Sequence, residues 1–222
     1  MMSTQPALKA SVILTADSPK GRQATDLFRD AYDHVGLDDK RGQFLNENKA
    51  FPAALRRLIE EHSMPVMAPE GGRIHILRVP VNPAREWQEA INAAGPNTPR
   101  NYDIRKVGNL HPPQSGEPKE KEIILVNFGK TIPNSQFALD WANPYSLRPA
   151  SPRECFAIGE HKPQLHRELD MNPMAVVSLE DCVFGGLWRV CCVWWGGSER
   201  VAGLSWFAYG WHGSYWFAFV RE

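Results

Sequence analysis

Apolar residues recur at helical spacing through much of the first half of the chain. Positions three or four residues apart predict helices over residues 22–35 and 51–62. A short apolar run predicts a strand over residues 11–15, and alternation of side chains between two faces predicts another over residues 73–81. The polar stretch over residues 37–49 is expected to be a loop or a weak helix. This half of the chain is therefore predicted to combine helices with a few strands.

The helices of the first half each carry an apolar stripe that is expected to face a core. In the first predicted helix the stripe consists of Ala24, Leu27, Phe28, Ala31 and Val35. A further helix is predicted to begin at Asn82, because Asn is a strong N-cap and Pro83 suits the first helical position. The inner stripe of that helix consists of Trp87, Ala90, Ile91 and Ala94.

Beyond residue 121, strong local signals mark one strand and two helices. Residues 122–128 predict a strand buried on both faces, since four consecutive apolar residues leave it no polar side. A helix is expected to start at Asn134 or Ser135, because both residues are good N-caps. Ser151 and Glu154 have the spacing of a capping box, in which each side chain satisfies a free amide, so a second helix begins there.

From residue 174 the pattern changes to short apolar runs separated by glycine-rich turns. Four strands are predicted over residues 174–179, 187–195, 201–209 and 214–220. Short strands at such regular spacing are typical of an antiparallel meander. The predicted fold class is therefore α+β, with helices packed on a largely antiparallel sheet that the C-terminal meander forms.

The predicted organisation has two subdomains. Residues 1–10 are expected to be disordered, and residues 11–110 to form an N-terminal α/β subdomain. A linker rich in Pro and Gly is placed at residues 111–121, followed by a C-terminal α+β subdomain over residues 122–222. One continuous domain is the alternative, because 222 residues suit either arrangement.

Aromatic residues concentrate in the predicted meander, where six of the eight tryptophans lie between residues 188 and 216. Both faces of these strands are apolar, so the sheet is either covered on both sides or leaves one aromatic face for a partner. We predict a binding surface for a protein or a saccharide, since Trp and Tyr dominate interface hot spots. The candidate binding residues are Trp206, Tyr209, Trp211 and Trp216.

Composition narrows the classes of partner and compartment. The formal net charge is +0, which argues against nucleic acid as a partner, because such proteins carry a basic excess. No apolar run is long enough to span a membrane, and the first residues lack the layout of a secretory signal. The four cysteines form no metal or disulfide pattern, so we expect a reduced, cytoplasmic protein. No cofactor motif is complete, since Gly129-Lys130-Thr131 lacks the preceding glycine of a phosphate-binding loop.

Three residues are candidates for catalysis. Cys155 lies in the first turn of the predicted Ser151 helix, where the helix N-terminus lowers the pKa of a thiol. His161 or His166 would have to serve as its base, but six residues along a helix place His161 on another face. These histidines also lack the spacing of a helical zinc motif, so a solvated turn without a metal is predicted around them.

One segment carries a resemblance to other proteins. Leu147-Arg148-Pro149-Ala150-Ser151-Pro152-Arg153-Glu154 precedes the Trp-rich hairpins, and the chain ends in Phe217-Ala218-Phe219-Val220-Arg221. This layout resembles bacterial and phage proteins in which an Arg-Pro-Ala-Ser/Thr helix leads into a Trp-rich antiparallel end. The resemblance implies a bacterial or phage origin. It implies no activity.

Three functional hypotheses follow from the sequence. The aromatic excess and the lack of a complete catalytic motif favour a non-catalytic binding or interaction module. A hydrolase that uses Cys155 or a cluster of His161 and His166 is the second hypothesis. A structural subunit of a larger assembly is the third, and the sequence predicts no oligomeric state.

Overall fold

The computed structural model describes residues 19–63 and 65–221. The chain divides into two compact units, residues 1–58 and residues 59–222. The predicted disordered start and the predicted strand at residues 11–15 lie outside the described residues.

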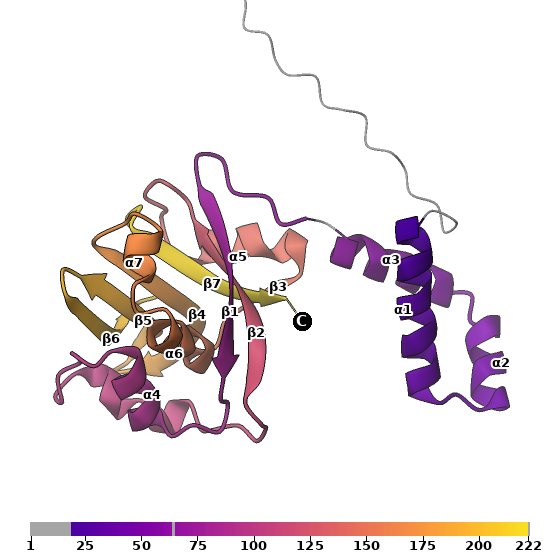
Figure 1. Ribbon diagram of the computed structural model, residues 1–222, viewed down its shortest axis with the longest axis horizontal. Helices are drawn as coiled ribbons and strands as arrows, with labels where there is room; N and C mark the ends of the chain where they lie inside the picture. Colours follow the sequence, from indigo (N-terminus) through magenta and orange to yellow (C-terminus); the bar gives the residue numbers. More distant parts are fainter. Residues whose placement is uncertain (1–18, 64, 222) are drawn as a thin grey trace, which may run out of the picture. The chain divides into compact units, whose positions relative to one another are not determined.

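The first unit is helical (Figure 1). Its helices are α1 (Pro19–Val35), α2 (Asp39–Glu47) and α3 (Phe51–Ser63), the last of which continues past residue 58. The helices predicted over residues 22–35 and 51–62 are confirmed. The stretch predicted as a loop or weak helix forms α2, because the Asp38 carboxylate accepts a hydrogen bond from the Arg41 amide and caps it.

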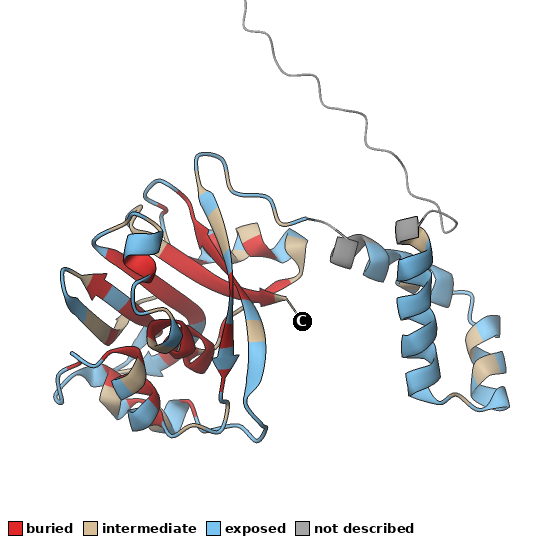
Figure 2. Ribbon diagram, in the orientation of Figure 1, coloured by how far each residue is buried: buried red, intermediate tan, exposed pale blue. Residues whose placement is uncertain are grey.

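The apolar stripe of α1 is exposed, so the predicted burial of this stripe is wrong. Leu27 is 69% exposed, and none of the side chains described in this unit is buried (Figure 2). The physical reason is that no described element of this unit packs across the stripe. Spacing alone showed that α1 is amphipathic, which does not establish that a core covers it.

The second unit is built on one sheet. Its strand order is β1-β2-β7-β4-β5-β6, and β3 pairs with β7 beyond that path. All pairings are antiparallel except the one between β4 and β7. The strands are β1 (Arg73–Val81), β2 (Lys119–Asn127), β3 (Leu147–Pro149), β4 (Met174–Phe184), β5 (Leu187–Gly196), β6 (Glu199–Trp206) and β7 (Tyr215–Arg221).

The predicted meander is correct for three strands and wrong for the last. β4, β5 and β6 follow one another as antiparallel neighbours, and Gly185-Gly186 supplies positive φ angles at the turn between β4 and β5. β7 instead returns to the middle of the sheet, between β2 and β4. Residues 216–220 of β7 are buried without interruption, which suits a central strand covered on both faces.

Helices cover both faces of the sheet. One apolar core lies beneath α4 (Trp87–Ala94) and α6 (Pro152–His161), and a second lies beneath α5 (Ser135–Ala142). The short elements are η1 (Asp103–Lys106), η2 (Gly108–Leu110), η3 (Asn143–Tyr145) and α7 (Leu165–Glu168). The fold is α+β, with helices on a mostly antiparallel sheet, as predicted.

The predicted linker at residues 111–121 does not separate two bodies. β1 precedes it and β2 begins inside it, at Lys119; the two strands pair along their whole length, from Arg73 with Asn127 to Val81 with Lys119. α4 also packs against α6, so elements before and after the linker share one core. The predicted subdomain boundary is therefore wrong, because long-range pairing joins the two parts.

The helix predicted to begin at Asn82 begins later, at Trp87. The Asn82 side chain accepts from the Ala84 amide and its carbonyl from the Arg85 amide, so it caps a turn instead. The capping box of α6 is present as predicted, with Ser151 and Glu154 satisfying each other's backbone amides.

Candidate functional site

Two of the four predicted binding residues lie in the core. Trp211 is 3% exposed and donates its indole N–H to the Ser135 hydroxyl at 3.1 Å. Trp216 is 1% exposed and directs its indole N–H at the Met171 sulfur, 3.3 Å away. The prediction that these rings form an exposed platform is wrong, because they fill the space between the sheet and the segments that cover it.

The other two predicted binding residues are more accessible. Trp206 and Tyr209 stack with ring centroids 5.2 Å apart, and Tyr209 is 62% exposed. The Arg189 guanidinium lies 3.5 Å from the centroid of the Trp206 ring, so this ring has a neighbour on each face. Trp188, which the sequence did not single out, is 57% exposed. Trp188 is next to Arg189 on β5, so its side chain points to the opposite face of the sheet from the Arg189 side chain that lies over Trp206. The accessible aromatic surface around Trp206 is therefore smaller than predicted, and Tyr209 is its exposed ring.

The structure does not support Cys155 as a nucleophile. Its side chain is fully buried, and its thiol lies 3.5 Å from the Val176 carbonyl oxygen. Burial raises the pKa of the Cys155 thiol well above its usual value, and the helix N-terminus does not offset this. His161 lies on the exposed side of α6, so it cannot act as the base for a thiol in the core.

We expect Cys155 to resist alkylation in the native protein. Iodoacetamide should label it about 100-fold more slowly than it labels the unfolded chain, because only the accessible thiolate reacts. Peptide mass spectrometry after timed labelling, with and without denaturant, measures both rates. Cys182, which is 8% exposed, serves as an internal reference for a buried thiol near the surface. Rapid native labelling confined to Cys155 would revive the nucleophile hypothesis.

His166 is buried in α7. Neither of its ring nitrogens has a hydrogen-bond partner among the described residues. Burial lowers the pKa of His166, and the neighbouring Arg167 lowers it further, so the ring is held neutral. The described residues contain no set of three His, Cys, Asp or Glu side chains placed to hold a metal ion, which gives no support to a metal site around His161 and His166.

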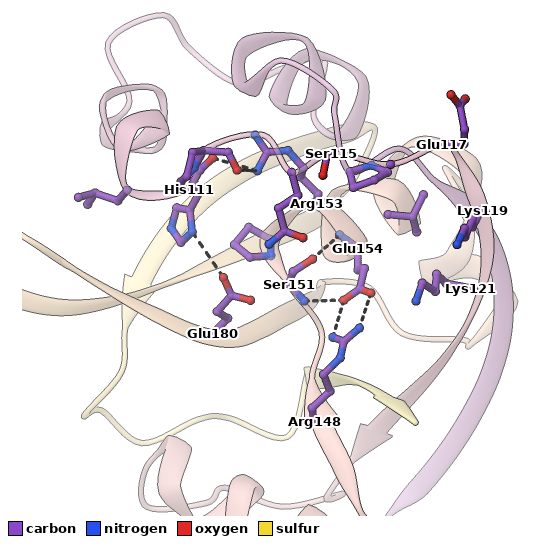
Figure 3. A pocket seen from close by; sticks show the side chains of 17 residues that line it. His111, Ser115, Glu117, Lys119, Lys121, Arg148, Ser151, Arg153, Glu154 and Glu180 are labelled. Carbon is purple, nitrogen blue, oxygen red and sulfur yellow. Dashed lines mark hydrogen bonds and ion pairs between the residues drawn. The ribbon is translucent and has the colours of Figure 1, made fainter. Parts of the chain in front are cut away.

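A cavity of about 320 Å³ lies where several segments of the second unit meet (Figure 3). The start of α6 forms one wall, and the loop over residues 110–118 forms another. The first residues of β2, the end of β1 with Pro83, and a residue from each of β3 and β4 complete the lining. The side chains that bring charge or acid–base chemistry to it are His111, Glu117, Lys119, Lys121, Arg148, Arg153, Glu154 and Glu180.

Arg153 ties the helix to the loop. Its Nε donates to the Arg85 carbonyl at 3.1 Å, and its Nη1 donates to the carbonyls of His111 and Pro112 at 2.9 and 3.2 Å. The side chain is only 9% exposed, and its Nη2 has no hydrogen-bond partner among the described residues. Desolvation by burial lowers the pKa of Arg153, and Glu86 and Glu180 oppose that shift.

His111 lies beside Arg153, on the opposite side of the cavity from the lysines (Figure 3). Its ring stacks on Trp87 at 5.1 Å between centroids, and the Arg153 guanidinium also lies over Trp87, at 5.6 Å. The Nδ1 of His111 is 3.8 Å from a carboxylate oxygen of Glu180. Its Nε2 is buried and has no hydrogen-bond partner among the described residues.

Arg148 and Glu154 form an ion pair within the site, so their charges cancel. Arg148 donates two hydrogen bonds to Glu154, both at 2.8 Å, and the Ser151 amide donates a third at 2.7 Å. Burial would raise the pKa of Glu154, but the hydrogen bonds from Arg148 and Ser151 outweigh it and lower the pKa. This carboxylate is therefore held ionised, and its charge is balanced within the protein.

Sequence reasoning missed the two residues at the centre of this cavity. His111 lies in the segment interpreted as a linker, and Arg153 in the capping motif, where only Ser151 and Glu154 drew attention. They are 42 residues apart, so their contact depends on how α6 docks against the 110–118 loop. The proline-rich composition of that loop was a visible signal of an ordered turn, but it carried no information about a partner.

Comparisons with protein-family models, with curated proteins and with solved structures find no match to the chain. Over the residues that the structure describes, no helix has both the length and the apolar character needed to cross a membrane.

Proposed function

We propose that the second unit is a binding module for a small anionic ligand, which the cavity holds through Arg153 and His111. The observation that carries this proposal is a pair of buried polar groups, Nη2 of Arg153 and Nε2 of His111, which have no partner among the described residues. Both belong to side chains that line one cavity and are more than nine-tenths buried.

Two buried polar groups without a hydrogen-bond partner in one cavity are significant, because such groups are costly. Leaving one unsatisfied costs about 1–3 kcal/mol, and more for a charged group. An anionic oxygen accepts from a guanidinium N–H, and it also accepts from the imidazole when Nε2 carries the proton.

The size and rigidity of the cavity fit a small molecule. Its volume of about 320 Å³ is near the lower end of the range of ligand pockets, about 300–1,000 Å³. Arg153 fixes the loop at His111 and Pro112, and the Gln114 amide donates to the Pro83 carbonyl at 3.0 Å. The walls are thus held by hydrogen bonds before any ligand enters, which lowers the entropic cost of binding.

Trp87 is a built-in reporter for the experiment. Its ring contacts both His111 and Arg153, and its indole N–H donates to the Ile104 carbonyl at 2.7 Å. We expect acetate or phosphate at millimolar concentration to shift one of the indole signals in a ¹⁵N-tryptophan NMR spectrum. The Trp87→Phe variant assigns that signal.

Variants of the full chain decide whether the shift reports this cavity. Arg153→Lys keeps a positive charge but loses the planar guanidinium, whose N–H groups donate in a fixed geometry. It should therefore weaken anion binding about tenfold. Arg167→Met removes an exposed arginine just beyond α6 and should leave the affinity unchanged. Absence of any anion-dependent shift of the Trp87 signal would refute the proposal, as would equal affinities of the native chain and Arg153→Lys.

The accessible aromatic surface supports a second candidate function. The exposed ring of Tyr209, which stacks on Trp206, suits a protein or saccharide partner, as the sequence led us to expect. We rank it second, because two of the four residues first proposed for it are buried and Trp206 is already stacked between neighbours.

A further inference from the structure

We infer that the open edge of β1 pairs with the same edge of a second copy of this chain, so that two sheets join into one. The pairing does not involve the anion site, whose central residues lie on α6 and the 110–118 loop. The two edge strands of the sheet, β1 and β6, differ in how the rest of the chain covers them.

The chain covers the β6 edge itself. The Asn97 amide donates to the Arg200 carbonyl at 3.2 Å, and the Ala202 amide donates to the Thr98 hydroxyl at 2.8 Å. On β1, by contrast, the backbone of residues 74–80 forms no hydrogen bond with described residues other than those of β2. One edge of the sheet is therefore closed, and the other is left with free backbone groups.

Pro80 identifies the residues of β1 whose backbone points outward. Successive residues of an antiparallel edge strand direct their N–H and C=O groups alternately toward the neighbouring strand and away from it. Proline occupies an outward position in such strands, because an inward one would remove a hydrogen bond to β2. Ile74, Ile76 and Arg78 are separated from Pro80 by an even number of residues, so their N–H and C=O groups also point outward.

A two-fold axis at Ile76 lets two such edges pair in the antiparallel sense. Ile76 then pairs with Ile76 of the second copy, and Ile74 of each copy pairs with Arg78 of the other. Every outward N–H of these residues meets an outward C=O. The Ile76 side chain, which is 54% exposed, then packs against its own counterpart. This register places no two like charges directly opposite each other.

The usual protection of an edge strand is weak along this stretch. Charged side chains and proline commonly prevent edges from pairing. Here the charge of Arg78 is balanced by Glu122 of β2, at 3.1 Å, and Pro80 lies beyond the last outward N–H that the pairing uses. The interface closes on itself, so it gives a dimer and not a filament. One strand pair buries less than the standard interface minimum of about 1,200 Å², so the dimer is expected to be weak.

The test begins with sedimentation of the full chain between about 10 μM and 1 mM, a range that suits a weak interface. We expect the mean mass to rise from that of one chain toward that of two. Hydrogen exchange of the backbone amides then identifies the edge. Exchange at Ile74, Ile76 and Arg78 should slow about threefold at the highest concentration. Exchange at Leu77 and Val79, whose amides already point toward β2, should not change.

Two variants of one residue separate the backbone from the side chain. Ile76→Pro removes the outward N–H at the two-fold axis and should abolish the dimer, while β1 keeps all its inward donors. Ile76→Lys keeps the N–H but places two charges face to face, so it should weaken the dimer about tenfold. Val183→Lys is the matched control, because Val183 is an aliphatic residue of β4 that is 51% exposed, and it should leave the association unchanged.

Three outcomes would overturn the inference. They are a chain that remains monomeric at the highest concentration, an association that survives the Ile76 variants, and an equal loss with Val183→Lys. Survival in the Ile76 variants would assign the association to another surface, such as the exposed stripe of α1. Far-ultraviolet circular dichroism confirms the fold of each variant, and Ile76→Lys decides alone if Ile76→Pro does not fold. None of these results bears on the anion site, which the Trp87 signal tests separately.

Discussion

The Trp216→Ala variant is expected to lose about 3–5 kcal/mol of the free energy of unfolding, the range for removing a large buried aromatic side chain. Trp216 is 1% exposed and lies on β7, directly opposite Val176 of β4 in the parallel pairing at the centre of the sheet. Its indole also covers the Met171 sulfur and lies 5.2 Å from the Arg73 guanidinium. Urea unfolding followed by circular dichroism measures the loss.

Tyr209→Ala is the matched control, because it removes an aromatic ring that is 62% exposed. It should change the free energy of unfolding by no more than about 0.5 kcal/mol, as exposed substitutions usually do. Equal stabilities of the Trp216→Ala and Tyr209→Ala variants would contradict the assignment of Trp216 to the core. The exposed platform first expected from the sequence would then regain its support.

Local signals in the sequence predicted several elements correctly, although the cap expected at Asn82 forms a turn and not a helix start. The alternation over residues 73–81 predicted β1 with the bounds that the structure shows. The capping box at Ser151 and Glu154 predicted the start of α6, because both hydrogen bonds form within one turn of chain. Helix α5 likewise starts where Asn134 can cap it.

Features decided by distant contacts were not predictable in the same way. The apolar residues on both faces of β7 left open whether both faces are covered, and they could not show that the strand lies between β2 and β4. The same limit applies to aromatic residues, since alternation assigns Trp216 to a face without saying whether that face is covered. Helix α1 was predicted correctly, but its apolar stripe was wrongly expected to be buried. Amphipathic spacing does not identify the element that packs against a helix.

The candidate site shows this limit most clearly. His111 and Arg153 can be recognised as site residues only in the folded structure, where α6 docks against the 110–118 loop and both side chains are buried. Lys119 and Lys121 were assigned to the predicted linker, and only the pairing of β1 and β2 places them beside that helix. The residues of the site come from segments that no motif links, so a search for motifs could not assemble them.

The largest effect at the site is expected from Arg153→Met. It removes the three hydrogen bonds to the carbonyls of Arg85, His111 and Pro112 and leaves those acceptors without their donor. Hydrogen bonds from charged groups contribute about 1.5–3 kcal/mol each, so a loss of about 3 kcal/mol is expected even if water reaches some of the carbonyls. Anion binding should be lost as well, because the substitution removes the guanidinium and also releases the 110–118 loop.

Arg153→Lys separates the two roles of this residue. A lysine keeps the charge but cannot reach three carbonyls with a planar fork, so it should restore part of the anion affinity and little of the stability. Arg167→Met, which removes an exposed arginine nearby, should change neither quantity. If Arg153→Met were as stable as the Arg167→Met control, the anchoring of the 110–118 loop by Arg153 would be wrong. If it also bound phosphate normally, the anion site would lie elsewhere.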